Sequence, residues 1–159
     1  MSNINGKHAR IWIEKNRIDN GLFRVYWKDL TGDEEYDNFE GGATLNPEEG
    51  EGLRYEWYYK DGERADGESK GWFVNGIPRS IYTYKNKKAN GLWAEWFPNG
   101  NKRKEGYHRD GNKIGIWKYW NPGGILIAEE KFNDGILVHE KHYNEQGKKF
   151  LDSKREPSI

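Results

Sequence analysis

Few residues in the sequence are suited to catalysis or metal binding, and the histidines are the first candidates. The chain holds four histidines, at positions 8, 108, 139 and 142, and no cysteine. Only His139 and His142 are close enough in sequence to share an ion. In an extended strand, side chains three positions apart point to opposite faces, so these two imidazoles are not expected to bind one metal together. The sequence predicts no metal site and no cofactor.

The second candidate is the stretch "HRDGN" at 108 to 112, which has the composition of the catalytic loop of protein kinases. A kinase also needs a glycine-rich phosphate loop, a lysine on a strand and a metal-binding aspartate in matching contexts, and these are missing. No serine stands in a nucleophile elbow. We therefore expect a protein that is not an enzyme.

Residues 29 to 51 form an acidic segment without Lys or Arg, in which Asp33, Glu34, Glu35 and Asp37 stand close together. Charge runs of this kind are usually solvated loops. The alternative is an acidic docking loop for a basic partner, such as a toxin that acts on nucleic acid through a positive active site. A calcium site has less support, because "DEEYDN" lacks the alternating ligands and central glycine of an EF-hand loop.

Aromatic side chains are the fourth candidate, because Trp, Tyr and Phe make up 15% of the chain. Either these rings cover one another within a sheet, or they leave one face exposed as a platform for a partner. Alternation puts Trp93 and Trp96 on opposite faces, so a one-layer sheet cannot bury both by itself. The N-terminal hairpin, a second protomer or a ligand must then cover one face. The candidate set is Trp72, Trp93, Trp96, Trp117, Trp120 and Tyr84.

Basic side chains are interspersed with acidic ones in the same region. Lysines at 102, 104, 148 and 149 and an arginine at 103 could attract phosphate groups, but glutamates at 95, 105, 129 and 130 lie nearby. A balanced, solvated face is the better interpretation.

Glycine and tryptophan recur at an interval of 24 residues. One series runs from Gly67 to Gly91 and on to Gly115. A weaker series joins Tyr84 to Phe132, with Tyr107 one residue early between them. Several parallel series at one period indicate a repeat architecture. The other series are Trp72, Trp96 and Trp120; Gly76, Gly100 and Gly124; and Lys87, Gly111 and Gly135.

Each repeat reads as two strands separated by turns. Asn-Gly dipeptides begin at 75, 90 and 99, and Asp-Gly dipeptides at 61, 66, 110 and 134. Such pairs tolerate the positive φ of type I′ hairpin turns. Gly or Pro interrupts almost every window long enough for a helix. The sequence predicts an all-β fold, an antiparallel meander of β-hairpins built from units of about 24 residues.

The ends of the chain depart from the repeat. The runs "HARIWIEK" and "GLFRVYWK" predict an N-terminal capping hairpin, and residues 1–50, with a short edge strand near 36–39, are expected to pack on the repeats. Residues 51–150 are expected to form the repeat sheet, in which "GLRYEWYYKDG" at 52 to 62 aligns with "GLWAEWFPNG". Residues 151–159 are expected to form a polar tail.

The net charge, the N-terminal sequence and the lack of cysteine limit the partners and the compartment that the sequence favours. Lys plus Arg and Asp plus Glu number 26 each, so no overall field favours nucleic acid or an anionic membrane. The start "MSNINGKHAR" lacks a signal-peptide core, and the longest apolar run, "ILIA", is too short to span a bilayer. The absence of cysteine fits a reducing compartment. We expect a cytoplasmic protein.

The unit G-x-W-x-x-W-x-x-x-G, followed by Tyr or Phe and an Asp-Gly turn, resembles the bacterial variant of the MORN repeat. It occurs as "GLWAEWFPNGNKRKEGYHRDGNKIG" and "GIWKYWNPGGILIAEEKFNDG", and "WYYKDGERADGESKGWFVNG" is similar. The resemblance implies a β-meander repeat protein with a binding role. Bacterial members are often described as antitoxin or immunity components, and eukaryotic relatives are associated with phosphoinositide membranes and scaffolding.

The resulting hypothesis is a non-catalytic binding protein, antitoxin-like or immunity-like, that holds a protein partner (a toxin or effector) against an aromatic repeat sheet. The alternative is a peripheral phospholipid or polyanion-binding scaffold. A homo-oligomer through a sheet edge or the aromatic face is a further possibility.

Overall fold

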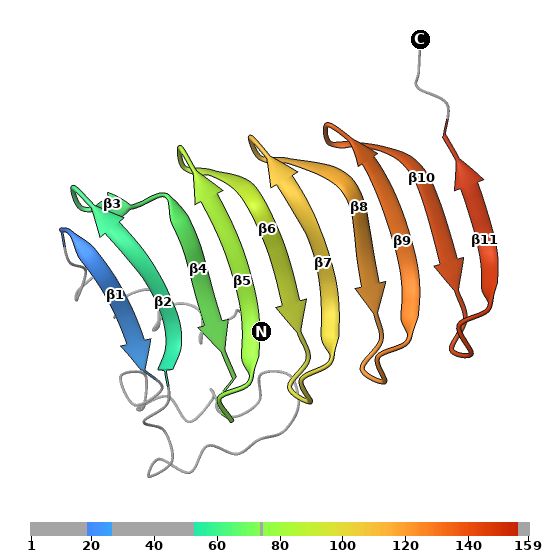
Figure 1. Cartoon of the computed structure of the whole chain (residues 1–159), viewed down its shortest axis with the longest axis horizontal. Helices are drawn as coiled ribbons and strands as arrows, with labels where there is room; N and C mark the ends of the chain where they lie inside the picture. The colour runs from blue at the N-terminus through green and yellow to red at the C-terminus, as the bar shows by residue number, and fades with distance from the viewer. Residues whose placement is uncertain (1–18, 27–52, 74, 156–159) are drawn as a thin grey trace, which may run out of the picture.

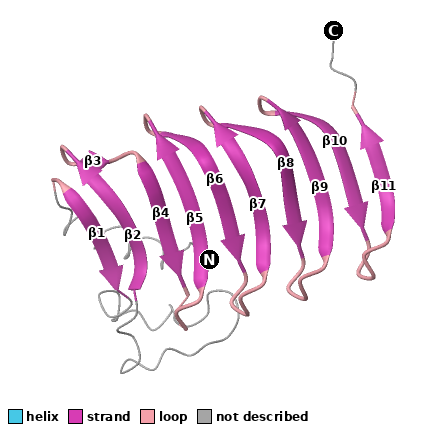
Figure 2. Cartoon of the chain, in the orientation of Figure 1, coloured by secondary structure: helices cyan, strands magenta, loops and turns pink. Residues whose placement is uncertain are grey.

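The computed structural model describes residues 19–26, 53–73 and 75–155, and all secondary structure in these ranges is β (Figures 1 and 2). The strands form a single eleven-stranded sheet. They are β1 (Gly21–Tyr26), β2 (Leu53–Lys60), β3 (Glu63–Arg64), β4 (Gly67–Trp72), β5 (Pro78–Lys85), β6 (Lys88–Trp96), β7 (Lys102–Arg109), β8 (Asn112–Trp120), β9 (Leu126–Asn133), β10 (Ile136–Tyr143) and β11 (Lys149–Lys154).

Strand order follows the chain from β1 to β11, except that the short β3 lies off this path and pairs with β2. Each neighbouring pair is antiparallel. Figure 1 shows the described strands side by side in one open layer. The predicted antiparallel hairpin meander is thus confirmed.

At one end of the strands, two-residue turns join neighbouring strands. Both residues of each turn have positive φ, as type I′ geometry requires. In the turn Asp110-Gly111 the φ angles are 50° and 92°. Lys87 takes the glycine position of one turn, as the 24-residue series predicts, and has φ 62°. The remaining turns of this kind are Asp61-Gly62, Asn86-Lys87 and Asp134-Gly135.

At the opposite end of the strands, neighbouring strands are joined by five-residue turns that share one hydrogen-bond pattern. In the turn 97–101, the Phe97 amide donates to the Asn101 carbonyl, and the Gly100 amide donates back to the Phe97 carbonyl. Side chains also join neighbouring turns, because Asn99 Nδ2 donates to the Pro122 carbonyl at 2.7 Å. Asn75 Nδ2 donates to the Pro98 carbonyl in the same way. The turns 73–77, 121–125 and 144–148 repeat the backbone pattern.

Two Asx-Gly dipeptides predicted as turns lie elsewhere. Asn90-Gly91 is inside β6, where the register with β5 shifts, and Asp66-Gly67 is at the start of β4. Gly91 has φ 118° and Gly115 in β8 has φ 66°, also beside a register shift. The positive φ is therefore used at these glycines for a β-bulge within a long strand and not for a hairpin turn.

The ends of the sheet differ from the sequence interpretation in two places. The strand β2 ends in a two-residue turn like that after β7, so "GLRYEWYYKDG" corresponds to the second strand of a unit and not to the first. β11 extends to Lys154, into the expected tail. β1 is the second strand of the predicted N-terminal hairpin, and it pairs antiparallel with β2. The first strand of that hairpin and the edge strand near 36–39 lie outside the described residues.

The register defines two faces. Trp93 pairs with Tyr82 and Gly106, and these residues lie on what we call the Trp93 face. Leu92 pairs with Tyr107, on the opposite Tyr107 face. Among the described residues, the buried ones are Phe23, Trp57, Tyr59, Gly71, Ser80, Ala94, Gly106, Trp117 and Ala128.

Candidate functional site

Rings on the Trp93 face form a continuous band from β5 to β8. Tyr82 stacks on Trp93 with centroids 4.0 Å apart. The imidazole of His108 stands edge-on between two indoles, 4.8 Å from Trp93 and 4.9 Å from Trp117. Tyr84 meets Trp93 at 5.9 Å. These ring contacts stabilise the face, since edge-to-face and offset pairs are the favourable arrangements.

His108, and not Tyr107, continues the 24-residue series that joins Tyr84 to Phe132. Tyr107 lies on the opposite face and is 54% exposed. The prediction that placed Tyr107 in this series was wrong by one residue, because histidine was not counted as a ring. A column of equivalent positions on the Trp93 face therefore contains Tyr59, Tyr84, His108 and Phe132.

Lys113 lies against aromatic rings on the Trp93 face. Its Nζ lies 4.4 Å from the ring centroid of Trp117 and 4.8 Å from that of Phe132. It also donates to the Tyr119 hydroxyl at 3.0 Å and lies 3.8 Å from Glu130. Burial lowers the pKa of Lys113 from its ordinary value. The ammonium completes the cover over Trp117, which is only 1% exposed.

Tyrosine hydroxyls on this face are fixed by carboxylates. Tyr82 donates to Glu95 at 2.6 Å, and Lys104 lies 2.8 Å from the same carboxylate. Tyr119 donates to Glu130 at 2.6 Å. Burial, and then the hydrogen bond to glutamate, raises the pKa of both tyrosines. These bonds hold the polar ends of the rings in place.

The Nδ1 atom of His108 is buried and has no hydrogen-bond partner within the described ranges. Burial lowers the pKa of His108, and the nearby charges of Lys113 and Lys104 lower it further. The imidazole is therefore neutral at pH 7 and acts as one more ring in the band.

The predicted aromatic set is divided between the two faces. Tyr84, Trp93 and Trp117 belong to the Trp93 face. Trp96 pairs with Lys102, whose Nζ lies 5.9 Å from the ring centroids of both Trp96 and Trp120. Lys102 also pairs with Glu105, which lies on the Tyr107 face beside Ala94. Strand alternation thus separates Trp93 from Trp96, as predicted.

Trp72 stands at the equivalent position to Trp96 at the end of β4, next to a five-residue turn. Its ring is half-buried, as are those of Trp96 and Trp120. The three tryptophans of the 24-residue series therefore form a row along the turn edge and not a pocket.

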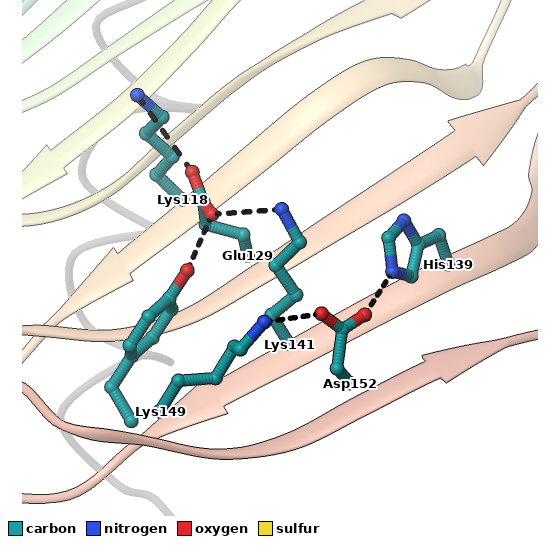
Figure 3. A network of polar contacts seen from close by, with 7 residues as sticks. Lys118, Glu129, His139, Lys141, Lys149 and Asp152 are labelled. Carbon is teal, nitrogen blue, oxygen red and sulfur yellow. Dashed lines mark hydrogen bonds and ion pairs between the residues drawn. The ribbon is translucent and has the colours of Figure 1, made fainter.

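Ion pairs and hydrogen bonds link neighbouring strands across the Tyr107 face from β8 to β11 (Figure 3). Glu129 accepts a hydrogen bond from the Tyr143 hydroxyl at 2.8 Å and lies near the ammonium groups of Lys118 and Lys141. Asp152 pairs with Lys149 and His139, which lower the pKa of its carboxyl to about 2. Glu95 and Lys104 are similarly paired on the Trp93 face. Basic side chains are therefore balanced by carboxylates, as predicted.

The remaining candidates from the sequence are the acidic loop and the histidine pair. The acidic loop with Asp33, Glu34, Glu35 and Asp37 lies outside the described residues. His139 and His142 contact different carboxylates, Asp152 and Glu140. Among the described residues, no group of three or more potential ligands is arranged to hold a metal ion. In the same ranges, no helix is long and apolar enough to cross a membrane.

Several members of the Trp93 face were not predicted from the sequence. For His108 a signal existed, because it lies one period after Tyr84. Lys113 and Glu130 have no like residue one period before or after them, so only the folded register brings them next to Tyr119.

Comparisons with known proteins add little. The chain matches no family model and no curated protein. Among solved structures, it is similar to a chain of the Glycosylation Associate Protein (Gap123) complex from Streptococcus agalactiae, with 17% sequence identity and a TM-score of 0.35. The match covers 58% of this chain and 18% of that chain.

Proposed function

We propose that this protein is a non-catalytic binding protein that holds another protein against its repeat sheet in the cytoplasm. Following the resemblance to bacterial MORN-variant repeats, the partner is a toxin or effector, and the protein acts as its antitoxin or immunity factor. The binding surface is the Trp93 face.

The band of rings around Trp93 carries this proposal. Trp and Tyr dominate the energetics of protein interfaces because each offers a large, stiff surface with a polar end. Here Trp93 is half-buried, stacked on Tyr82, and flanked by His108. Because Tyr82 is also bonded to Glu95, few side-chain motions would be lost on binding.

A protein partner suits the charge distribution better than a phospholipid surface. Anionic membranes attract clusters of basic side chains that are free of carboxylates. Lys104 is paired with Glu95, Lys102 with Glu105, and Lys118 with Glu129. Alternating charges of this kind favour orientation and selectivity at a protein interface.

The test is affinity capture of the full-length chain from its native host, with identification by mass spectrometry. We expect one stoichiometric protein partner. Trp93→Ala should release this partner, whereas Trp96→Ala, on the opposite face, should retain it. Trp93→Phe keeps the stack on Tyr82 and is a second variant in case Trp93→Ala does not fold.

If the partner is a toxin, co-expression with this protein should restore growth to cells that produce it. Capture without any stoichiometric protein, together with co-sedimentation with anionic liposomes, would instead support the scaffold on membranes. Equal retention by the Trp93 and Trp96 variants would exclude the Trp93 face as the binding surface.

A further inference from the structure

A hollow of about 380 Å³ opens on the Trp93 face, near the two-residue turns at the β2 end of the sheet. Two tyrosines, Tyr59 and Tyr84, line it together with Arg64 and Lys87. These tyrosines occupy equivalent positions in neighbouring units. The hollow is therefore the space between two successive rings of the aromatic column.

The hollow exists because β2 and β4 separate toward this edge. They pair at Tyr55 with Gly71 and at Glu56 with Lys70, whereas β4 and β5 pair along the whole of β4. Beyond that point β2 pairs with the two-residue β3, after which the chain crosses to β4. Where the strands part, the space between the column rings stays open.

Arg64 is a cation without a carboxylate partner among the described residues. Its Cζ lies 4.2 Å from the ring centroid of Trp57, and this stacking leaves the N–H groups at the edge of the guanidinium free. At the equivalent position in another unit, Lys113 is balanced by Glu130. In the hollow, Lys87 is already paired with Glu63, so Arg64 supplies one unbalanced positive charge.

Tyr59 supplies an unused hydrogen-bond donor at the same place. The residue is only 8% exposed and lines the hollow. Tyr82, Tyr119 and Tyr143 each donate to a glutamate. No hydrogen bond joins the Tyr59 hydroxyl to any residue in the described ranges. The hydroxyl is not one of the buried polar atoms left unpaired, so it is accessible from the open space of the hollow and can donate to an acceptor there.

We propose that the hollow binds the carboxylate of an acidic side chain on the partner protein. Arg64 is suited to bind a carboxylate through two parallel N–H donors, and the Tyr59 hydroxyl adds a third. Tyr84 and Ala65 provide a wall for an apolar residue next to the acidic one. This inference rests on the proposed function, because it assigns one anchoring group of the partner.

The charge of the hollow selects a carboxylate over a phosphate. Arg64, Lys87 and Glu63 together carry one net positive charge, which matches one carboxylate. A phosphorylated side chain carries about −1.5 to −2 charges at pH 7 and would remain partly unbalanced.

The experiment uses the full chain and two blocked dipeptides, acetyl-Phe-Glu-amide and acetyl-Phe-Gln-amide, followed by NMR. We expect saturable shifts of the Arg64 side-chain N–H and the Tyr59 ring with the Glu peptide, and at least about tenfold weaker binding of the Gln peptide. Arg64→Gln should weaken binding of the Glu peptide by about the same factor. Arg109→Gln, at another exposed position near a two-residue turn, is the matched control and should bind normally.

Equal binding of the two peptides, or no saturable shift, would overturn the proposal. A free acid, 3-phenylpropionate, tests the source of the carboxylate. If it binds more tightly than the Glu peptide, the hollow accepts a small acid and not a partner side chain, and the assignment is wrong.

The outcomes also separate this inference from the proposed function. If Trp93→Ala releases the captured partner and Arg64→Gln retains it at full affinity, the Trp93 face binds the partner but the hollow does not. If no partner is captured while the Glu peptide still binds through Arg64, the carboxylate site exists and the proposed function fails.

Discussion

The indole of Trp117 lies flat against the backbone of Gly106, so closely that a Cβ at Gly106 would come within 2.2 Å of its Cδ2 atom. Gly106 occupies the position that Tyr82 holds one period earlier. At that earlier position the ring of Tyr82 stacks on Trp93. Replacing a ring by glycine lets the indole of Trp117 sink onto the strand and become buried.

Gly106→Ala should therefore destabilise the protein by about 2 kcal/mol or more, because the added methyl group displaces a buried ring. The free energy of unfolding in urea, followed by tryptophan fluorescence, measures this. Gly123→Ala, where an added Cβ would meet only Asn121 Oδ1 at 3.3 Å, is the control and should cost less. In a Trp117→Ala background the cost of Gly106→Ala should shrink. An equal cost in both backgrounds would contradict the contact.

His108→Phe should make the protein more resistant to acid. The pKa of His108 in the fold is below its ordinary value of 6.5, so folding opposes protonation. The stability that this neutral ring contributes is present above pH 6.5 and is lost as the pH falls through the lowered pKa. Phenylalanine stands at the equivalent position in β9, so the substitution fits the repeat.

Melting temperatures of the His108→Phe variant and the parent should therefore diverge as the pH falls below about 6.5. His142→Gln removes an imidazole that contacts Glu140, and it should not reproduce this gain. A constant difference across the pH range would show that His108 is not the group responsible.

The side chain of Asn99 is expected to act in two separable ways. Its Oδ1 accepts from the Asn101 amide at 3.0 Å within its own turn, and its Nδ2 donates to the Pro122 carbonyl of the next. Asn99→Asp keeps only the first bond and should cost about 1 kcal/mol. Asn99→Ala loses both and should cost about 2 kcal/mol. Identical losses in chemical denaturation would mean that the link between turns contributes nothing.

Lys87→Gly should stabilise the protein by about 1 kcal/mol, because Lys87 has φ 62° and glycine adopts this region without strain. The loss of its exposed ion pair with Glu63 offsets about 0.5 kcal/mol at most. Asn86→Gly, at φ 50° in the same turn, should gain less because asparagine tolerates positive φ. Thermal unfolding of the two variants would decide the order.

Much of the architecture could be predicted because glycine and tryptophan recur at one interval. The series through Trp96 and Gly100 identified paired strands, and Lys87 was recognised in a glycine position. The dipeptide Asn90-Gly91 was misplaced, since a positive φ serves a hairpin turn and a bulge equally well. Composition alone does not distinguish the two.

The site was predicted less well, for a physical reason. Alternation correctly separated Trp93 from Trp96, yet the contacts around them depend on which residues lie opposite across strands. Lys113 reaches Trp117 and Phe132 through a register that shifts at the bulge near Gly115. A shift of one residue would send these side chains to the other face.

The links between successive turns also make the molecule adjustable in length. Within the described sheet each strand pairs with its neighbours along the path, so the sheet has no centre that must be rebuilt when a unit is gained. Duplicating residues 91–114 would carry β11 away from β1 by ~10 Å, two strand spacings, and leave the existing hydrogen bonds intact. Gain or loss of one unit would therefore lengthen or shorten the Trp93 face by about two strand spacings.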